Sequence, residues 1–364
     1  MSMYTTMIKP VFFKMDPEQV HERMTFLGTQ LGNSRVGRAT VRGLCYFKHP
    51  LLNLTVAGIN FDNPIGLAAG FDKNARLHKI LPEVGFGFAE LGSITGEPCA
   101  GNPRPRLFRL QQEKSILVNY GLYNEGCETI SKRLANVKFK IPIGFSVAKT
   151  NNPALGLEEG IQDYQKAYKH LHGLGSYTTI NVSCPNTSDG ITYQDPHKLT
   201  QLLASLNKEK HIKPIFLKIK SDFTNTELAE IVDIAEKYPW VTGFIISNLR
   251  TNRQGLGTTK QDIDALSLRG ALSGLPVQEQ SNKALSFVSK RTSKILIGCG
   301  GVFTGKDAYN KLKNGASLIQ LVTALIYEGP TVISRINREL VDIIQAQGFG
   351  NISECITALH DSAS

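Results

Sequence analysis

From Asn60 onward, short apolar runs alternate with longer segments in which apolar residues recur at helical spacing. The short runs are Pro64–Ala69, Phe86–Leu91, Ile143–Val147, Thr178–Val182, Ile215–Ile219, Gly243–Ile246, Ile295–Ile297 and Leu318–Leu321. The helical segments include Glu158–Leu174, His197–Lys208, Thr226–Tyr238, Asn282–Lys290 and Gly305–Asn314. Eight short buried strands that alternate with helices predict an α/β fold, a (β/α)8 TIM barrel. A doubly wound open sheet is the alternative, because periodicity does not show whether a sheet closes.

Residues 1–45 follow a different pattern, which predicts a small N-terminal helical arm. Apolar residues recur at helical spacing up to Met15, and Asp16 followed by Pro17 is typical of a helix N-terminus. The helix that follows carries one apolar stripe, formed by Val20, Met24, Leu27 and Leu31. We therefore expect two short amphipathic helices with a basic excess. Such helices attach to membrane surfaces or pack entirely on a neighbouring domain.

Composition excludes several classes of protein. No apolar run reaches the roughly 18 residues that a membrane-spanning helix needs, and the N-terminus lacks the apolar region of a secretory signal. The six cysteines are widely spaced and none forms a CxxC pair, so a reduced chain is favoured over a disulfide framework. The formal charge of +10 suggests an anionic partner, but the basic residues are scattered, so nucleic acid is not expected.

Polar residues follow the ends of the expected strands, where TIM barrels place their active sites. Four asparagines lie at these ends or in adjoining loops, namely Asn119, Asn181, Asn186 and Asn248. Their paired donors and acceptors suit a planar ligand with amide-like edges. For any single asparagine a cap or a turn is the commoner explanation, but four together favour a binding site.

Three further features point to chemistry at the same end of the barrel. Lys218 lies in a buried strand and needs a partner, which a bound flavin or phosphate would supply. Cys184 lies in a polar loop, which favours a catalytic role, although most cysteines are inert core residues. Gly300 and Gly301 in the string GCGG would let backbone amides approach a phosphate, and a tight turn explains them equally well.

Together these segments resemble the dihydroorotate dehydrogenases, from about Met3 to beyond Gly329. The most specific strings are NPIGLAAGFDKNA, GNPRPRLFRL, TINVSCPNT, ALSG, IGCGGV and GASLIQL. The helical N-terminus with DPEQVHE resembles the quinone-using branch, in which a two-helix arm docks on the membrane and frames the quinone tunnel. The resemblance divides the chain into this arm, residues 1–45, and an FMN-binding barrel, residues 46–364.

The resemblance implies three groups of binding residues and no metal site. For FMN they are Ala69, Gly70, Lys73, Ser93, Ser146, Asn181, Lys218, Ser247, Gly274, Gly300, Gly301, Val322 and Thr323. For the substrate they are Lys73, Asn119, Tyr120, Gly121, Leu122, Asn181, Asn186 and Asn248. For the quinone tunnel they are His21 and Arg109.

The implied activity is the oxidation of dihydroorotate to orotate in pyrimidine biosynthesis, with FMN as cofactor and a membrane quinone as co-substrate. Cys184 would be the base, Lys73 would pair with the substrate carboxylate, and Lys218 would offset negative charge on the reduced flavin. Five features depart from the quinone branch. That branch has Ser where this chain has Cys184, and its orotate loop is one residue longer than Asn119–Asn124. It also has a flavin-contacting Asn, a Thr and a tunnel Tyr where this chain has Ser146, Leu249 and Val322.

Two other functions remain as alternatives. One is a related flavin oxidoreductase that acts on another cyclic amide or uses a soluble acceptor. The other is a non-enzymatic barrel that binds a phosphate ligand or a membrane. The resemblance further implies a monomer, attached peripherally to the cytoplasmic face of a bacterial inner membrane. A mitochondrial inner membrane is less favoured because the N-terminus does not resemble a transit peptide.

Overall fold

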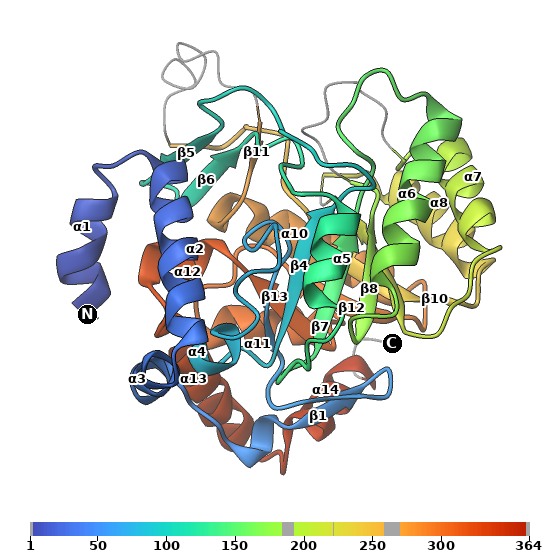
Figure 1. Cartoon of the computed structure of the whole chain (residues 1–364). Helices are drawn as coiled ribbons and strands as arrows, with labels where there is room; N and C mark the ends of the chain where they lie inside the picture. Colours follow the sequence, from blue (N-terminus) through green and yellow to red (C-terminus); the bar gives the residue numbers. More distant parts are fainter. Residues whose placement is uncertain (1–2, 184–192, 221, 258–269, 362–364) are drawn as a thin grey trace.

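The computed structural model describes residues 3–183, 193–220, 222–257 and 270–361. A closed barrel of parallel strands forms its centre (Figure 1). Around the barrel the strands are β10 (Val241–Ile246), β12 (Ile295–Cys299), β13 (Leu318–Leu321), β3 (Ile65–Leu67), β4 (Phe88–Ile94), β7 (Ile143–Val147), β8 (Tyr177–Asn181) and β9 (Ile215–Ile219). The predicted TIM barrel is confirmed, and each expected strand overlaps one of these. Parallel strands are buried on both faces, so their sequences are continuous apolar runs that can be recognised without the structure.

Helices surround the barrel, and those predicted from periodicity are confirmed with shifted ends. They are α4 (Leu81–Val84), α5 (Cys127–Leu134), α6 (Leu157–Leu171), α7 (Pro196–Leu206), α8 (Asn225–Glu236), α10 (Gln278–Ser289), α11 (Gly305–Lys313), α12 (Thr323–Glu328) and α13 (Val332–Ala346). The far end of the barrel carries η2 (Pro50–Leu52), the hairpin β1 (Leu54–Val56) and β2 (Ile59–Phe61), and α14 (Ile352–Asp361) (Figure 1). The short helix η3 (Leu275–Val277) leads into α10.

The long connection after β4, which runs to α5, contains regular structure. Strands β5 (Leu107–Leu110) and β6 (Ser115–Val118) form an antiparallel hairpin, and β11 (Ala271–Leu272) adds a third strand to it. The sheet lies above the carboxyl ends of the barrel strands, beside the arm (Figure 1). It brings a segment near residue 271 next to one near residue 118, so the loop wall is a folded unit.

The N-terminal arm has more elements than the two expected helices. It consists of η1 (Tyr4–Ile8), α1 (Lys9–Phe12), α2 (Pro17–Asn33) and α3 (Arg35–Cys45). The predicted cap is confirmed, because the Asp16 carboxylate accepts a hydrogen bond from the Gln19 amide at 2.9 Å. No helix among the described residues is long and apolar enough to cross a membrane.

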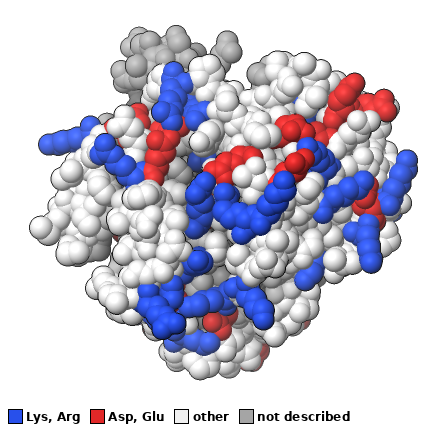
Figure 2. Space-filling view, viewed as in Figure 1, with Lys and Arg blue, Asp and Glu red and all other residues white. Residues whose placement is uncertain are grey.

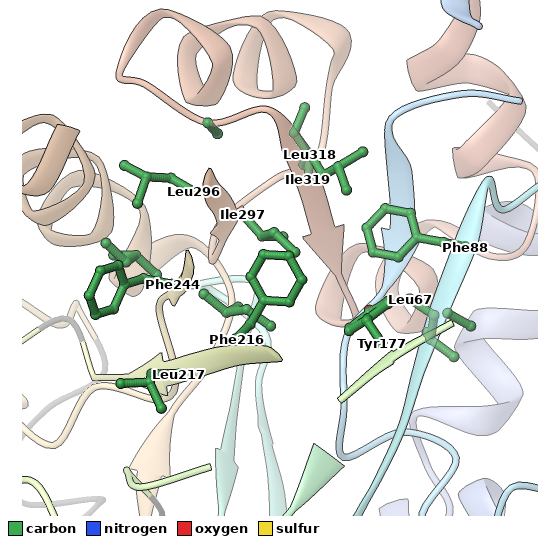
Figure 3. Packing of buried hydrophobic residues seen from close by; sticks show 14 of the residues in the cluster. Leu67, Phe88, Tyr177, Phe216, Leu217, Phe244, Leu296, Ile297, Leu318 and Ile319 are labelled. Carbon is green, nitrogen blue, oxygen red and sulfur yellow. The ribbon is translucent and has the colours of Figure 1, made fainter. Parts of the chain in front are cut away.

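The interior of the barrel is layered. Phe88, Tyr177 and Phe216 fill the lower layer with edge-to-face contacts (Figure 3). Gly66 and Gly144 face these rings, since a Cβ at either position would lie 2.4 Å and 2.1 Å from ring carbons of Phe88 and Tyr177. Two residues further along each strand, the side chains that point inward become polar, because side chains alternate along a strand. This change from apolar to polar marks the floor of the functional site.

Candidate active site

The polar layer is built around Glu90, which is fully buried at the centre of the barrel. Its carboxylate accepts hydrogen bonds from Thr179 Oγ1 at 2.9 Å, Gln320 Nε2 at 2.9 Å and Lys218 Nζ at 3.2 Å. These partners come from β8, β13 and β9. Sequence reasoning missed Glu90, whose only signal was a single acidic residue inside an apolar strand.

Lys218 therefore has a protein partner in Glu90, which corrects the expectation that a bound ligand must supply one. Burial lowers the pKa of Lys218, but the Glu90 carboxylate outweighs it, and the net pKa is raised. Lys218 stays protonated at neutral pH as half of a buried ion pair. Its side chain also lines the cavity above.

That cavity, of about 420 Å³, lies over the polar layer and is enclosed by strand ends, loops and the arm. It brings together most of the residues predicted to bind cofactor, substrate and quinone. Those that line it are His21, Ala69, Gly70, Lys73, Ser93, Arg109, Tyr120, Gly121, Leu122, Asn181, Lys218, Ser247, Asn248, Gly274, Gly300, Gly301, Val322 and Thr323. Cys299, Ser273 and Tyr4 line it as well and were not predicted.

Ser146 and Asn119 were predicted to touch ligands, and neither lines the cavity. Ser146 lies one layer back, where its hydroxyl shares a 2.7 Å hydrogen bond with Ser93. The Asn119 side chain accepts from Asn102 Nδ2 at 2.9 Å, which holds the wall of the site. Cys184 and Asn186 lie outside the described residues.

The asparagines that do line the cavity are held by a chain of hydrogen bonds. Asn181 Nδ2 donates to Ser93 Oγ at 2.7 Å, and Asn248 Nδ2 donates to Ser183 Oγ at 2.9 Å and to Asn181 Oδ1 at 3.2 Å. The network fixes both amide planes, so the remaining amide atoms are preorganised for a ligand with complementary edges.

Lys73 is the second cation of the site. Its ammonium lies 3.7 Å from the centre of the Tyr120 ring and 3.3 Å from Nε2 of His21 in α2. Among the described residues, no carboxylate forms an ion pair with it within 4.0 Å. Burial lowers the pKa of Lys73 to about 8, with Glu18 opposing the shift. Burial and repulsion from Lys73 also lower the pKa of His21, which is neutral at pH 7.

One end of the cavity is formed by the loop after β12. Gly300 and Gly301 have φ angles of +107° and +72°, which glycine adopts readily. A Cβ at Gly301 would lie 2.3 Å from the Gln278 Cβ, so only glycine fits there without rearrangement. Thr323, at the start of α12, lines the same end and donates to Ser273 Oγ at 2.9 Å.

The arm forms the opposite wall of the cavity. Pro17, Val20, Met24, Leu27 and Leu31 of α2 line it, so the predicted apolar stripe faces the cavity. Arg109 in β5 faces the same space, donates to the Met15 carbonyl at 2.9 Å and stacks on Phe13 at 4.7 Å.

A buried ion pair joins the arm to the barrel and was not predicted. Arg106 donates to Glu18 through Nε at 3.0 Å and Nη2 at 2.8 Å, and both side chains are at most 6% exposed. Arg106 Nη1 donates to the carbonyls of Ala100 and Asn102, at 2.8 Å and 2.9 Å. Because Asn102 also holds Asn119, the arm is connected to the segment that carries Tyr120.

Comparison with known proteins agrees with this geometry. The family model described as dihydroorotate dehydrogenase matches residues 51–344. The chain belongs to the dihydroorotate dehydrogenase family. It is therefore an oxidoreductase, and the reaction of the family, oxidation of dihydroorotate to orotate, is a step of pyrimidine biosynthesis.

Two relatives of the family named dihydroorotate dehydrogenase (quinone) span nearly the whole chain. The protein from Nostoc punctiforme is 37% identical over 98% of both chains, and that from Natronomonas pharaonis is 34% identical over 96% of this chain and 97% of its own. The ligand-free dihydroorotate dehydrogenase of Eimeria tenella has a similar structure, with a TM-score of 0.81 and 28% identity over 93% of this chain and 98% of that one. The similarity includes the arm, since both relatives cover almost the full length.

Proposed function

We propose that the chain oxidises dihydroorotate to orotate with FMN as its bound cofactor and a membrane quinone as electron acceptor. One observation carries the proposal: a single cavity has a polar, cationic barrel wall and an apolar arm wall. The first suits a charged, amide-bearing substrate and a flavin, and the second suits a lipophilic acceptor. Relatives named dihydroorotate dehydrogenase (quinone) extend over the arm as well as the barrel.

The residues at the barrel mouth fit FMN. At Gly301 any side chain would collide with Gln278 of α10, so glycine is required there, and the loop backbone that lines the cavity can approach a phosphate closely. Gly274 lines the cavity as well, and only glycine fits there, because a Cβ would lie 2.2 Å from the Lys114 carbonyl oxygen. Asn181 and Lys218 would face the ring system with a donor and a cation. When bound, FMN would supply the acceptor for a hydride from the substrate and pass the electrons to the quinone.

The substrate would be held by Lys73 and the two fixed asparagines. An ammonium with no carboxylate partner among the described residues favours an anionic group, such as the carboxylate of dihydroorotate. Asn181 and Asn248 would hydrogen-bond the ring amides and keep the ring in one plane.

Cys184 would remove the proton from the substrate carbon. Asn181, three residues earlier, lines the cavity, so the loop that follows starts at the site. A thiol titrates near about 8.5, far closer to working pH than a serine hydroxyl, so a thiolate base is accessible.

The exposed apolar residues of the arm support peripheral attachment to a membrane. Eight of the eleven large apolar side chains that are exposed in the described residues belong to it, namely Met3, Met7, Val11, Met24, Phe26, Leu27, Val36 and Leu44. Figure 2 shows mostly uncharged surface over α1 and α2, with basic side chains nearby. A lipophilic acceptor would enter the cavity between these residues without leaving the membrane.

The test is spectroscopic. We expect the purified protein to be yellow, to lose its flavin absorbance when dihydroorotate is added without oxygen, and to regain it when a short-chain quinone follows. A protein without flavin would contradict the proposal. A flavin that dihydroorotate does not bleach, but another cyclic amide does, would assign the barrel to a different substrate.

A further inference from the structure

Lys311 in α11 is a fully buried lysine that the proposed chemistry does not use. Its methylene chain packs under β12, where a Cβ on Gly298 would lie 3.1 Å from the Lys311 Cδ. Its ammonium donates a hydrogen bond to Ser281 Oγ in α10. Among the described residues, no carboxylate lies within ion-pair distance of it.

The carboxylate that acts on its charge, Asp307, is one helical turn away and already accepts other hydrogen bonds. Its carboxylate accepts from the Phe303 amide at 3.0 Å, the Thr304 amide at 2.9 Å and Gln278 Nε2 at 2.9 Å. Asp307 therefore completes the capping box of α11 and does not neutralise Lys311. A buried cation without a counterion is unfavourable, and burial lowers the pKa of Lys311 to about 8.

Lys311 lies directly behind the glycine loop at the cavity. Ser281 Oγ, which accepts from its ammonium, also lies 3.5 Å from the carbonyl oxygen of Gly300. Gln278 Nε2 donates to the carbonyl of Gly301 at 2.5 Å. Both loop carbonyls thus point away from the cavity, toward α10.

The orientation of these carbonyls fixes that of the next amides. In a trans peptide the C=O and the N–H point in opposite directions, so the N–H groups of Gly301 and Val302 point toward the cavity. No described residue accepts a hydrogen bond from either one. The loop presents two free donors, and an unneutralised ammonium lies behind it.

We propose that Lys311 is a positioning residue that makes this loop selective for the phosphate of the cofactor. The inference rests on the proposed function, because the anion is taken to be the phosphate group of FMN. Lys311 would act through space, with Ser281 holding its ammonium behind the loop, and without touching the phosphate. Lys218 contrasts with it: the charge of Lys218 is neutralised by Glu90, whereas Lys311 has no carboxylate partner among the described residues and would gain a counterion when the phosphate binds.

A comparison of FMN with riboflavin measures the effect of Lys311 on phosphate binding, because the two flavins share the ring system and differ in the phosphate. Flavin-free protein would be titrated with each, and binding followed by quenching of flavin fluorescence. In Lys311→Met, which keeps the length of the side chain and removes its charge, we expect FMN to bind at least about tenfold more weakly. Riboflavin affinity should change less than about twofold.

Lys313→Met is the matched control, since Lys313 lies on the same helix and is exposed. It should leave both affinities unchanged. Ser281→Ala, which keeps the charge and removes its hydroxyl partner, should give a smaller loss that is again confined to FMN. If Lys311→Met does not fold, Ser281→Ala still tests the proposal through the ratio of the two affinities.

The role of Lys311 would be overturned if neither variant changed the ratio of FMN to riboflavin affinity. This holds whether both affinities stay the same or both fall by the same factor. Failure of the proposed function looks different, because the parent protein itself would then bind neither flavin.

Discussion

The two walls of the cavity differ in how they are stabilised. The barrel wall carries Lys218, Asn181 and Asn248, whose polar groups are held by hydrogen bonds to residues of several strands. The arm wall is an apolar stripe on a single helix, joined to the barrel by the buried ion pair of Glu18 and Arg106. Chemistry that needs fixed polar groups belongs on the barrel wall, and passage of a lipophilic molecule belongs beside the apolar arm wall.

The ion pair between the walls should give the largest effect. In Glu18→Ala, Arg106 keeps its burial and loses its carboxylate, which costs about 3 kcal/mol for such a pair. We expect the arm to detach first, seen as faster amide exchange over α2, while the barrel stays folded.

Glu22→Ala is the control for this prediction. Glu22 is 48% exposed and pairs with the exposed Arg104, so its loss should cost below about 1 kcal/mol. Equal exchange in the two variants would mean that the ion pair does not hold the arm.

The barrel wall would be tested by Cys184→Ala. If this thiol is the base, reduction of the flavin by dihydroorotate should slow at least about a hundredfold. Oxidation of chemically reduced protein by quinone should be unchanged. Stopped-flow absorbance measures both steps, and a reductive rate within a few-fold of the parent would leave Cys184 as a packing residue. Cys184→Ser should keep partial activity, with its pH dependence moved upward.

The two walls were not equally predictable from sequence. The barrel strands could be predicted because both of their faces are buried, which makes them continuous apolar runs. The carboxyl ends of these strands meet at one end of the barrel, so residues far apart in sequence, such as Lys73 and Asn248, could be assigned to one site. The apolar stripe of the arm could also be predicted, but the surface that it faces could not. The same pattern fits a helix that lies on a membrane and one that packs on a protein.

Residues whose role depends on a partner were missed. Glu90 is a single acidic residue in an apolar strand, and its role follows only from its ion pair with Lys218, which lies on another strand. Lys311, in the string KLKNG, resembled the exposed end of a helix. The sheet of β5, β6 and β11 escaped because its strands have two to four residues, too few for a periodic signal, and its third strand comes from far along the chain.

The apolar arm wall would be tested by Met24→Glu. Met24 lines the cavity, so a carboxylate there should disfavour a lipophilic acceptor and raise the KM for a short-chain quinone at least about tenfold. Reduction of a soluble dye should be unchanged, because the barrel wall is intact.

Phe26→Glu is the control, since Phe26 is 68% exposed and does not line the cavity. The same rise in KM in both variants would show that acceptor entry depends on arm charge in general, and not on this wall.

The smallest effect should arise where the walls meet, at Lys73. Its pKa of about 8 means that the free protein loses this charge as pH rises from 7 to 9. Binding of an anionic ring such as orotate needs the charged form, so the dissociation constant should rise about tenfold over that range. Titration of the flavin absorbance with orotate at each pH measures this dissociation constant.

Lys73→Arg supplies the comparison, because a guanidinium does not lose its proton in this range. Its dissociation constant should not change with pH, even if its absolute affinity is lower. A parallel rise in the parent and in Lys73→Arg would place the titrating group elsewhere.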